Sequence, residues 1–144
     1  MEIFKCIIDL PKFPIKKNNK AIFRNKATGR SFIASNSKAQ NLMNILNAKL
    51  LQEKLRAGID TIECDVNVSM QFYFEESFFY TKQGKRSSKV PDLDNLYGSV
   101  LDGLQKVGII QNDSQVCSHD NSFRAAIPQG HKLKIVITKY EAKA

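Results

Sequence analysis

The fold is decided by residues 62–74, which read IECDVNVSMQFYF from Ile62 to Phe74. Apolar and polar side chains alternate along this stretch without a break. A period of two residues is typical of a β-strand that buries one face and turns the other to water. We therefore predict a strand over residues 62–74 and, around it, a sheet with one covered face.

Two amphipathic segments flank this strand and can cover that face. The first has apolar residues at helical spacing (Ala39, Leu42, Met43, Leu46 and Leu50), a capping-box pattern from Ser37 to Gln40 and a stop at Gly58. The second carries Leu96, Val100, Leu101, Leu104 and Val107, with Gly108 beyond its end. The spacing predicts two helices, with Ser37 as the N-cap of the first.

The two ends of the chain complete the predicted sheet. Residues 2–10 have apolar residues on both faces, which predicts a buried strand that Pro11 and Pro14 terminate. Residues 133–138 alternate after a turn at residues 128–130, whereas residues 115–127 are weakly patterned and fit either a strand or an extended arm. The order of elements predicts an α+β fold: a two-layer sandwich with helices on one face of a mixed or mainly antiparallel sheet.

Composition narrows the class of protein. A chain of 144 residues predicts a single domain spanning residues 1–144. Lys and Arg outnumber Asp and Glu by 22 to 14, a net charge of +8 that suits nucleic acid or an anionic surface. No apolar run is long enough to span a bilayer, and the first ten residues do not resemble a signal peptide. Cys6, Cys64 and Cys117 form no C-x-x-C pair, so we expect reduced thiols and a cytoplasmic protein without a membrane partner.

Basic residues concentrate in two loops. One begins at residue 16 and turns at Thr28-Gly29; the other, at about residues 81–90, is expected to be mobile. Lysine and arginine in such loops are candidates for contacts to DNA phosphates; they are Lys16, Lys17, Arg24, Lys26, Arg30, Lys85, Arg86 and Lys89. Phe78, Phe79 and Tyr80 precede the second loop, and their sequence leaves open a dimer contact, a wedge in DNA or a strand end.

Carboxylates gather directly after the second basic loop. Pro91 favours an extended residue before it and a helix after it, so Asp92 and Asp94 lie at the helix start. Asp113, in the segment after this helix, could complete a three-carboxylate site for a hard cation such as Mg²⁺. A bound Mg²⁺ activates a water molecule for attack on a phosphodiester. The simpler interpretations are that Asp94 caps the helix or interacts with its dipole, that Asp113 occupies a turn and that Asp102 faces solvent.

Three motifs together resemble the RusA family of Holliday-junction resolvases, in its phage-type form. They are Pro91-Asp92-Leu93-Asp94-Asn95-Leu96, Val100-Leu101-Asp102-Gly103-Leu104 and Asn112-Asp113-Ser114-Gln115-Val116. The N-terminal stretch is similar too, at Pro14-Ile15-Lys16-Lys17-Asn18, Arg24-Asn25-Lys26 and Gly29 to Ser35. Order and spacing of the separate motifs agree with the family pattern.

The resemblance implies an endodeoxyribonuclease of DNA recombination and repair in a bacterial or phage-infected cell. Such an enzyme is a homodimer that depends on Mg²⁺, with Mn²⁺ as an alternative ion, and nicks a four-way junction at two symmetric positions. Asp92, Asp94 and Asp113 match the family's catalytic and metal-binding carboxylates, with Asn95 and Asp102 as supporting residues. Two identical sites related by a two-fold axis suit a nearly two-fold junction.

One departure from the family pattern matters most, and a second is that Asn112 stands where many members have the first aspartate of the turn. The family usually has lysine four residues after the second aspartate, where this chain has Gly98. Lys85, Arg86 or Lys89 could supply the missing charge, with Lys106 and Arg124 as weaker candidates. His119 and His131 have no ligand-like spacing and are interpreted as solvent or turn residues.

The departure leaves two alternatives to a junction resolvase. One is a branched-DNA-binding protein that keeps the fold but lacks efficient cleavage because of Gly98; the other is a nuclease acting on flaps or forks. The number of metal ions, the base preference and the dimer interface do not follow from the sequence.

Overall fold

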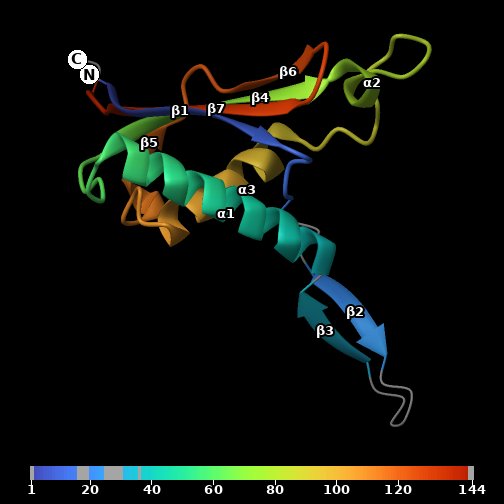
Figure 1. Ribbon diagram of the computed structural model, residues 1–144, viewed down its shortest axis with the longest axis horizontal. Coiled ribbons are helices and arrows are strands. Elements are labelled where there is room, and N and C mark those ends of the chain that lie inside the picture. Colours follow the sequence, from blue (N-terminus) through green and yellow to red (C-terminus); the bar gives the residue numbers. More distant parts are fainter. Residues whose placement is uncertain (1, 16–19, 25–30, 36, 143–144) are drawn as a thin grey trace.

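A five-stranded sheet forms one layer of the protein and two long helices form the other (Figure 1). The structure, a computed structural model, describes residues 2–15, 20–24, 31–35 and 37–142. Both long helices lie on the same face of the sheet, so the predicted α+β two-layer sandwich is confirmed. No helix in these ranges is long and apolar enough to cross a membrane.

The sheet is mixed and is built around β4. Its strands are β1 (Glu2–Leu10), β7 (His131–Lys139), β4 (Val66–Glu75), β5 (Val116–Ser118) and β6 (Phe123–Ile127). β1 pairs with β7 and β7 pairs with β4, both antiparallel, while β5 and β6 each run parallel to β4 along its other edge. Cys6, Ile135 and Met70 face one another across the first three strands. Their side chains belong to the buried core.

The helices are α1 (Ser37–Ala57), the single turn α2 (Glu76–Phe79) and α3 (Leu93–Lys106). α1 and α3 bury Leu46, Leu50, Leu96 and Leu104 completely against the sheet. They meet at Gly103, where a Cβ atom would lie 2.9 Å from the Asn47 side-chain oxygen and 3.0 Å from Leu50. Glycine in the second motif therefore lets α3 pack closely against α1, because a larger residue would make these side chains shift.

The ends of both helices agree with those predicted, whereas the start of α1 differs by one residue. α1 ends directly before Gly58, whose φ of +65° is the left-handed conformation expected after a helix, and Gly108 (φ +75°) plays the same part after α3. α1 begins at Ser37, one position earlier than an N-cap serine would allow. The residue before it lies outside the described ranges.

The strand predictions need correction at two places. The long strand begins at Val66, not Ile62, because Ile62 forms an isolated parallel bridge with Ile110. β1 is an edge strand with only one buried face, since Ile7 remains 57% exposed. For residues 115–127 the strand alternative is confirmed, in the form of the two strands β5 and β6.

The first basic loop contains a β-ribbon that the sequence did not predict. β2 (Lys20–Arg24) and β3 (Ser31–Ser35) pair antiparallel and form a sheet of their own. The ribbon extends away from the two layers, beyond the N-terminal end of α1 (Figure 1). The predicted Thr28-Gly29 turn lies outside the described residues.

Candidate functional site

The start of α3 presents two carboxylates to solvent. Asp92 occupies the N-cap position in extended conformation (φ −63°, ψ 150°), yet its side chain makes no capping hydrogen bond. Asp94 lies in the first helical turn, so it is not the cap of the helix, and its place agrees with the alternative that its charge interacts with the helix dipole. Both side chains are exposed. Neither carboxylate is therefore committed to capping the helix, which leaves their oxygens available to a ligand.

Each carboxylate lines its own hollow. Asp92 shares a hollow of about 240 Å³ with Asn95 and Lys89, among other residues. Asp94 lines a hollow of about 380 Å³ together with Leu93, Tyr97, Gly98 and His119. Both hollows lie at the start of α3, and the residues that line one differ from those that line the other. Of the predicted basic residues, Lys89 is thus placed beside Asp92.

The third carboxylate, Asp113, is held at the opposite end of α3. It begins the 3₁₀ turn η2 (Asp113–Gln115), and its N–H donates to Oε1 of Gln105 at 2.9 Å. Gln105 is eleven residues beyond Asp94, which corresponds to about 16 Å along a helix axis. Within the described residues, no group of three or more His, Cys, Asp or Glu side chains could hold one metal ion. A single copy of the chain does not bring the three predicted ligands together.

Gln115 fixes the position of Asp113. Its side-chain Oε1 accepts the N–H groups of Gln111 (2.8 Å) and Asn112 (2.7 Å), and its Nε2 donates to the carbonyls of Ile62 (2.8 Å) and Cys64 (2.9 Å). Gln115 is only 7% exposed. These hydrogen bonds hold the segment 111–115 (the return segment) against residues 62–64, which lead into β4. The glutamine of the third motif therefore has a structural role.

The supporting and DNA-contacting residues are distributed around the same helix. Asn95 lines the hollow of Asp92, and Asp102 lies on α3 between the two carboxylate positions with an exposed side chain. Lys85 and Arg86 are exposed in the second basic loop. Arg24 belongs to β2, whereas Lys16, Lys17, Lys26 and Arg30 lie outside the described residues.

The second basic loop folds back on itself. Tyr80 and Arg86 form an antiparallel bridge, and the N–H of Thr81 donates to the carbonyl of Lys85 at 2.6 Å. Val90, at the end of the loop, is buried in the core. This arrangement leads the chain directly to Pro91 and the start of α3. Mobility of the loop stays a prediction.

The aromatic residues before this loop have different surroundings. Phe79 is buried, and Phe78 stacks on Phe74 with ring centroids 5.8 Å apart. Tyr80 is 43% exposed and contacts Phe79 edge-on. Phe78 and Phe79 thus contribute to the core, which leaves Tyr80 as the exposed ring next to the basic loop.

Two residues to which the sequence assigned no clear role in the site, Arg124 and His119, lie at the start of α3 in the structure. Arg124 on β6 donates from a guanidinium nitrogen to the carbonyl of Pro91 at 2.9 Å, immediately before Asp92. His119 lies against Tyr97 beside Asp94, with ring centroids 5.7 Å apart. Both come from the weakly patterned stretch 115–127, where no spacing rule points to α3. Only the pairing of β5 and β6 with β4 brings them there.

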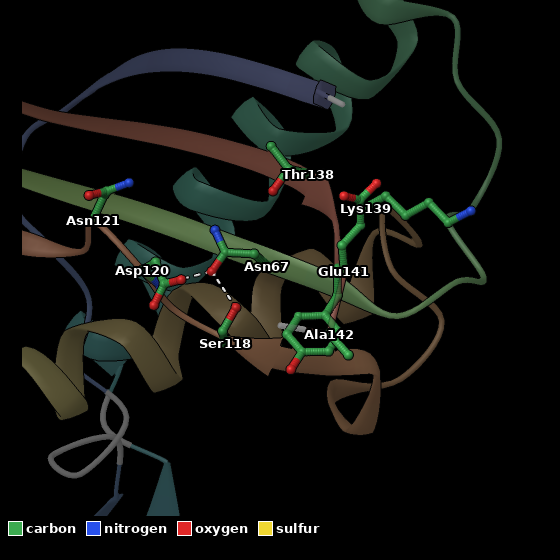
Figure 2. A pocket seen from close by; sticks show the side chains of 9 residues that line it. Asn67, Ser118, Asp120, Asn121, Thr138, Lys139, Glu141 and Ala142 are labelled. Carbon is green, nitrogen blue, oxygen red and sulfur yellow. Dashed lines mark hydrogen bonds between the residues drawn. The ribbon is translucent and has the colours of Figure 1, made fainter. Parts of the chain in front are cut away.

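A larger polar hollow, of about 570 Å³, lies at the end of β4 near the C-terminus. Figure 2 shows Asn67 at its centre, with its side-chain oxygen joined to Ser118 and Asp120. That oxygen accepts the Ser118 hydroxyl at 2.6 Å and the Asp120 N–H at 2.8 Å. These bonds hold both residues that flank His119.

The donor chemistry at the start of α3 fits a hard divalent cation. Carboxylate oxygens are the ligands that Mg²⁺ prefers, and one or two carboxylates commonly suffice when a substrate phosphate completes the coordination. Asp92 and Asp94 are two such carboxylates, and both are exposed.

A family model described as endodeoxyribonuclease RusA matches residues 11–137 of the chain. The chain belongs to the RusA endodeoxyribonuclease family and is accordingly a nuclease. No curated protein matches the sequence. The matched range includes all three carboxylate positions and both basic loops.

Proposed function

We propose that this protein is a Mg²⁺-dependent, homodimeric endodeoxyribonuclease that resolves four-way DNA junctions by paired symmetric nicks. The observation that carries the proposal is Asp92: it occupies an N-cap position without capping, two residues from a second exposed carboxylate, in a chain of the RusA family. An aspartate that gives up a capping bond worth about 1 kcal/mol is available for another ligand.

Asp92 and Asp94 would hold the ion at the start of α3. When bound, Mg²⁺ lowers the pKa of a coordinated water and offsets negative charge on the phosphoryl oxygens. Mn²⁺ takes similar oxygen ligands and is the expected substitute. Asn95, which lines the Asp92 hollow, is placed to support that carboxylate or the phosphate that approaches it.

The surrounding groups favour a DNA phosphate at this position. Backbone N–H groups at a helix start attract anions, and the first turn of α3 offers them beside the carboxylates. Lys89 lines the Asp92 hollow, and Lys85 and Arg86 extend the positive charge into the preceding loop. These side chains bind and orient the backbone without reading base sequence.

The place of Asp113 supports a dimer with shared sites. Asp113 is anchored near the C-terminal end of α3, too far from Asp94 for one ion to bridge them within a chain. A second copy related by a two-fold axis across α3 would bring its Asp113 to the Asp92 and Asp94 of the first copy. The same axis generates a second, identical site. Two sites so related match the two opposed strands of a junction.

Cleavage of an end-labelled synthetic four-way junction tests the proposal. We expect symmetric nicks with Mg²⁺ and none with EDTA. Asp92→Asn and Asp94→Asn should each lower the cleavage rate at least about 10²-fold, because a neutral amide is a poor ligand for Mg²⁺ and charge on the phosphate is then less well offset. Junction binding measured without metal should remain, and Asp60→Asn, an exposed aspartate in the loop after α1, serves as the matched control. Near-normal cleavage by Asp94→Asn would refute the site.

Gly98 favours a second candidate function, a junction-binding protein without efficient cleavage. In that case the same assay would give a shifted, salt-sensitive complex and no metal-dependent product. Flap and fork substrates run in parallel separate a junction resolvase from a nuclease of other branched DNA.

A further inference from the structure

Three of the side chains that line the hollow beside Asp94 are polar: Asp94, Tyr97 and His119. Its volume is about 380 Å³, and its lining residues are Leu93, Asp94, Tyr97, Gly98 and His119. Gly98 leaves the hollow open, since an added Cβ atom there would meet no atom within 4 Å. Space for a ligand therefore exists directly next to the carboxylate of Asp94.

His119 is the side chain in this hollow that can offer a hydrogen-bond donor to a ligand. Leu93 and Gly98 have no polar side-chain atoms, and an ionised Asp94 only accepts. The Tyr97 hydroxyl already donates to the carbonyl of Val68 at 2.7 Å, and burial raises the pKa of that hydroxyl. An imidazole carries at least one N–H whether neutral or protonated, so its role needs no particular charge state.

His119 is held in place from both sides. The Asn67 oxygen accepts hydrogen bonds from the Ser118 hydroxyl and the Asp120 N–H, the two residues adjacent to His119 (Figure 2). The His119 carbonyl accepts the N–H of Ser122 at 3.2 Å, which closes the turn after it. Its ring rests edge-on against Tyr97, at an interplanar angle of 67°. An exposed histidine that is anchored in this way can present its N–H to a ligand without a large loss of side-chain entropy.

We propose that His119 contacts the scissile phosphate and donates a hydrogen bond to one of its oxygens. This role rests on the proposed nuclease function and deepens it. Phosphodiester cleavage builds negative charge on the phosphoryl oxygens, and donors fixed in a partly apolar hollow stabilise that charge most effectively. His119 thus supplies, from the β5–β6 connection, the donor that Gly98 cannot supply from α3.

Steady-state cleavage of the junction by His119→Ala and His119→Gln tests this role. We expect His119→Ala to lower kcat about 10²-fold with little change in junction affinity, because the hydrogen bond strengthens as charge develops. His119→Gln keeps an N–H donor and should retain more activity. Added imidazole should restore part of the activity of His119→Ala by entering the hollow, while sodium chloride of equal ionic strength should not. Gln129→Ala, an exposed substitution in the β6–β7 turn, is the control.

The outcomes separate this inference from the function on which it rests. Wild-type cleavage with an unchanged kcat in His119→Ala would overturn the role of His119 and leave the nuclease assignment standing. A loss of activity matched by an equal loss of junction binding, or by a lower melting temperature, would also overturn it. Absence of cleavage by the wild-type protein would overturn both.

Discussion

At the residue scale, the positions that matter most around the site are those that hold the carboxylates, and Gln115 is the best defined of them. One buried amide satisfies two N–H groups of the return segment and two carbonyls of the segment before β4. No other residue type has two donors and two acceptor lone pairs in one planar group of this length. The glutamine in the Asn112-Asp113-Ser114-Gln115 motif therefore determines where Asp113 lies.

Gln115→Ala should lower the free energy of unfolding by roughly 1–3 kcal/mol, because partly buried backbone groups lose their partners. The change should appear as a lower midpoint of urea denaturation with an unchanged m-value. It should also slow cleavage by releasing Asp113. Gln111→Ala, which removes an exposed side chain two residues before Asp113, is the matched control. An unchanged midpoint for Gln115→Ala would mean that the four bonds contribute nothing net.

Single residues also show what the sequence could and could not reveal about the site. Asp92 and Asp94 could be placed at a helix start because a proline and a helix pattern determine their position locally. His119 was interpreted as a solvent residue, and its position beside Asp94 depends on β5 pairing with β4, a contact across about fifty residues of sequence. Periodicity describes neighbours along the chain and holds no information on such distant pairings.

At the scale of elements, α3 links the separate motifs. Its start carries Asp92 and Asp94, its outward side carries Asp102, and Gln105 near its end holds the N–H of Asp113. The helix itself was predictable from apolar spacing and Gly108. The ribbon β2–β3 was not, because its five-residue strands are separated by a basic stretch that resembles an ordinary loop.

The ribbon provides the element-scale prediction. Residues 16–35 contain six basic residues and no acidic ones: Lys16, Lys17, Lys20, Arg24, Lys26 and Arg30. Changing all six to glutamine should weaken junction binding and reduce the slope of log K against log salt by about 0.9 for each DNA phosphate that these side chains neutralise in the wild-type complex. Because β2 and β3 form a sheet of their own, the melting temperature of the main fold should stay unchanged. The measurement is a salt titration of binding by fluorescence anisotropy.

A control set of lysines elsewhere in the fold tests whether the ribbon itself contacts DNA or whether any positive charge has the same effect. Lys5, Lys132 and Lys134 lie on β1 and β7, and their change to glutamine should alter the salt slope less for each charge removed. Equal effects per charge from the two sets would indicate that only the net charge of +8 drives binding.

At the scale of the whole molecule, the two-layer fold explains why the three predicted carboxylates do not meet within one chain. The sheet and α1 bury one side of α3, and Gly103 allows close packing against α1. The carboxylates at the two ends of α3 are therefore far apart. The sequence predicted the layers, since alternating strands and amphipathic helices determine them. It predicted the three carboxylates as one cluster because motif order carries no information on distance along a rigid helix.

Shared sites in a dimer make a prediction that sites within single chains do not. Asp94→Asn and Asp113→Asn should each be inactive as pure homodimers. Co-expression with two different affinity tags would yield the heterodimer of the two variants. In it, one shared site carries both substitutions, whereas the other combines the intact Asp94 of one copy with the intact Asp113 of the other. We therefore expect the heterodimer to recover cleavage of one strand, seen as a single nick in an end-labelled junction.

If each site were built within one chain, both sites of the heterodimer would carry a defect and no nick would appear. A heterodimer of Asp92→Asn with Asp94→Asn is the matched control and should stay inactive under the shared arrangement, because those two residues come from the same helix start.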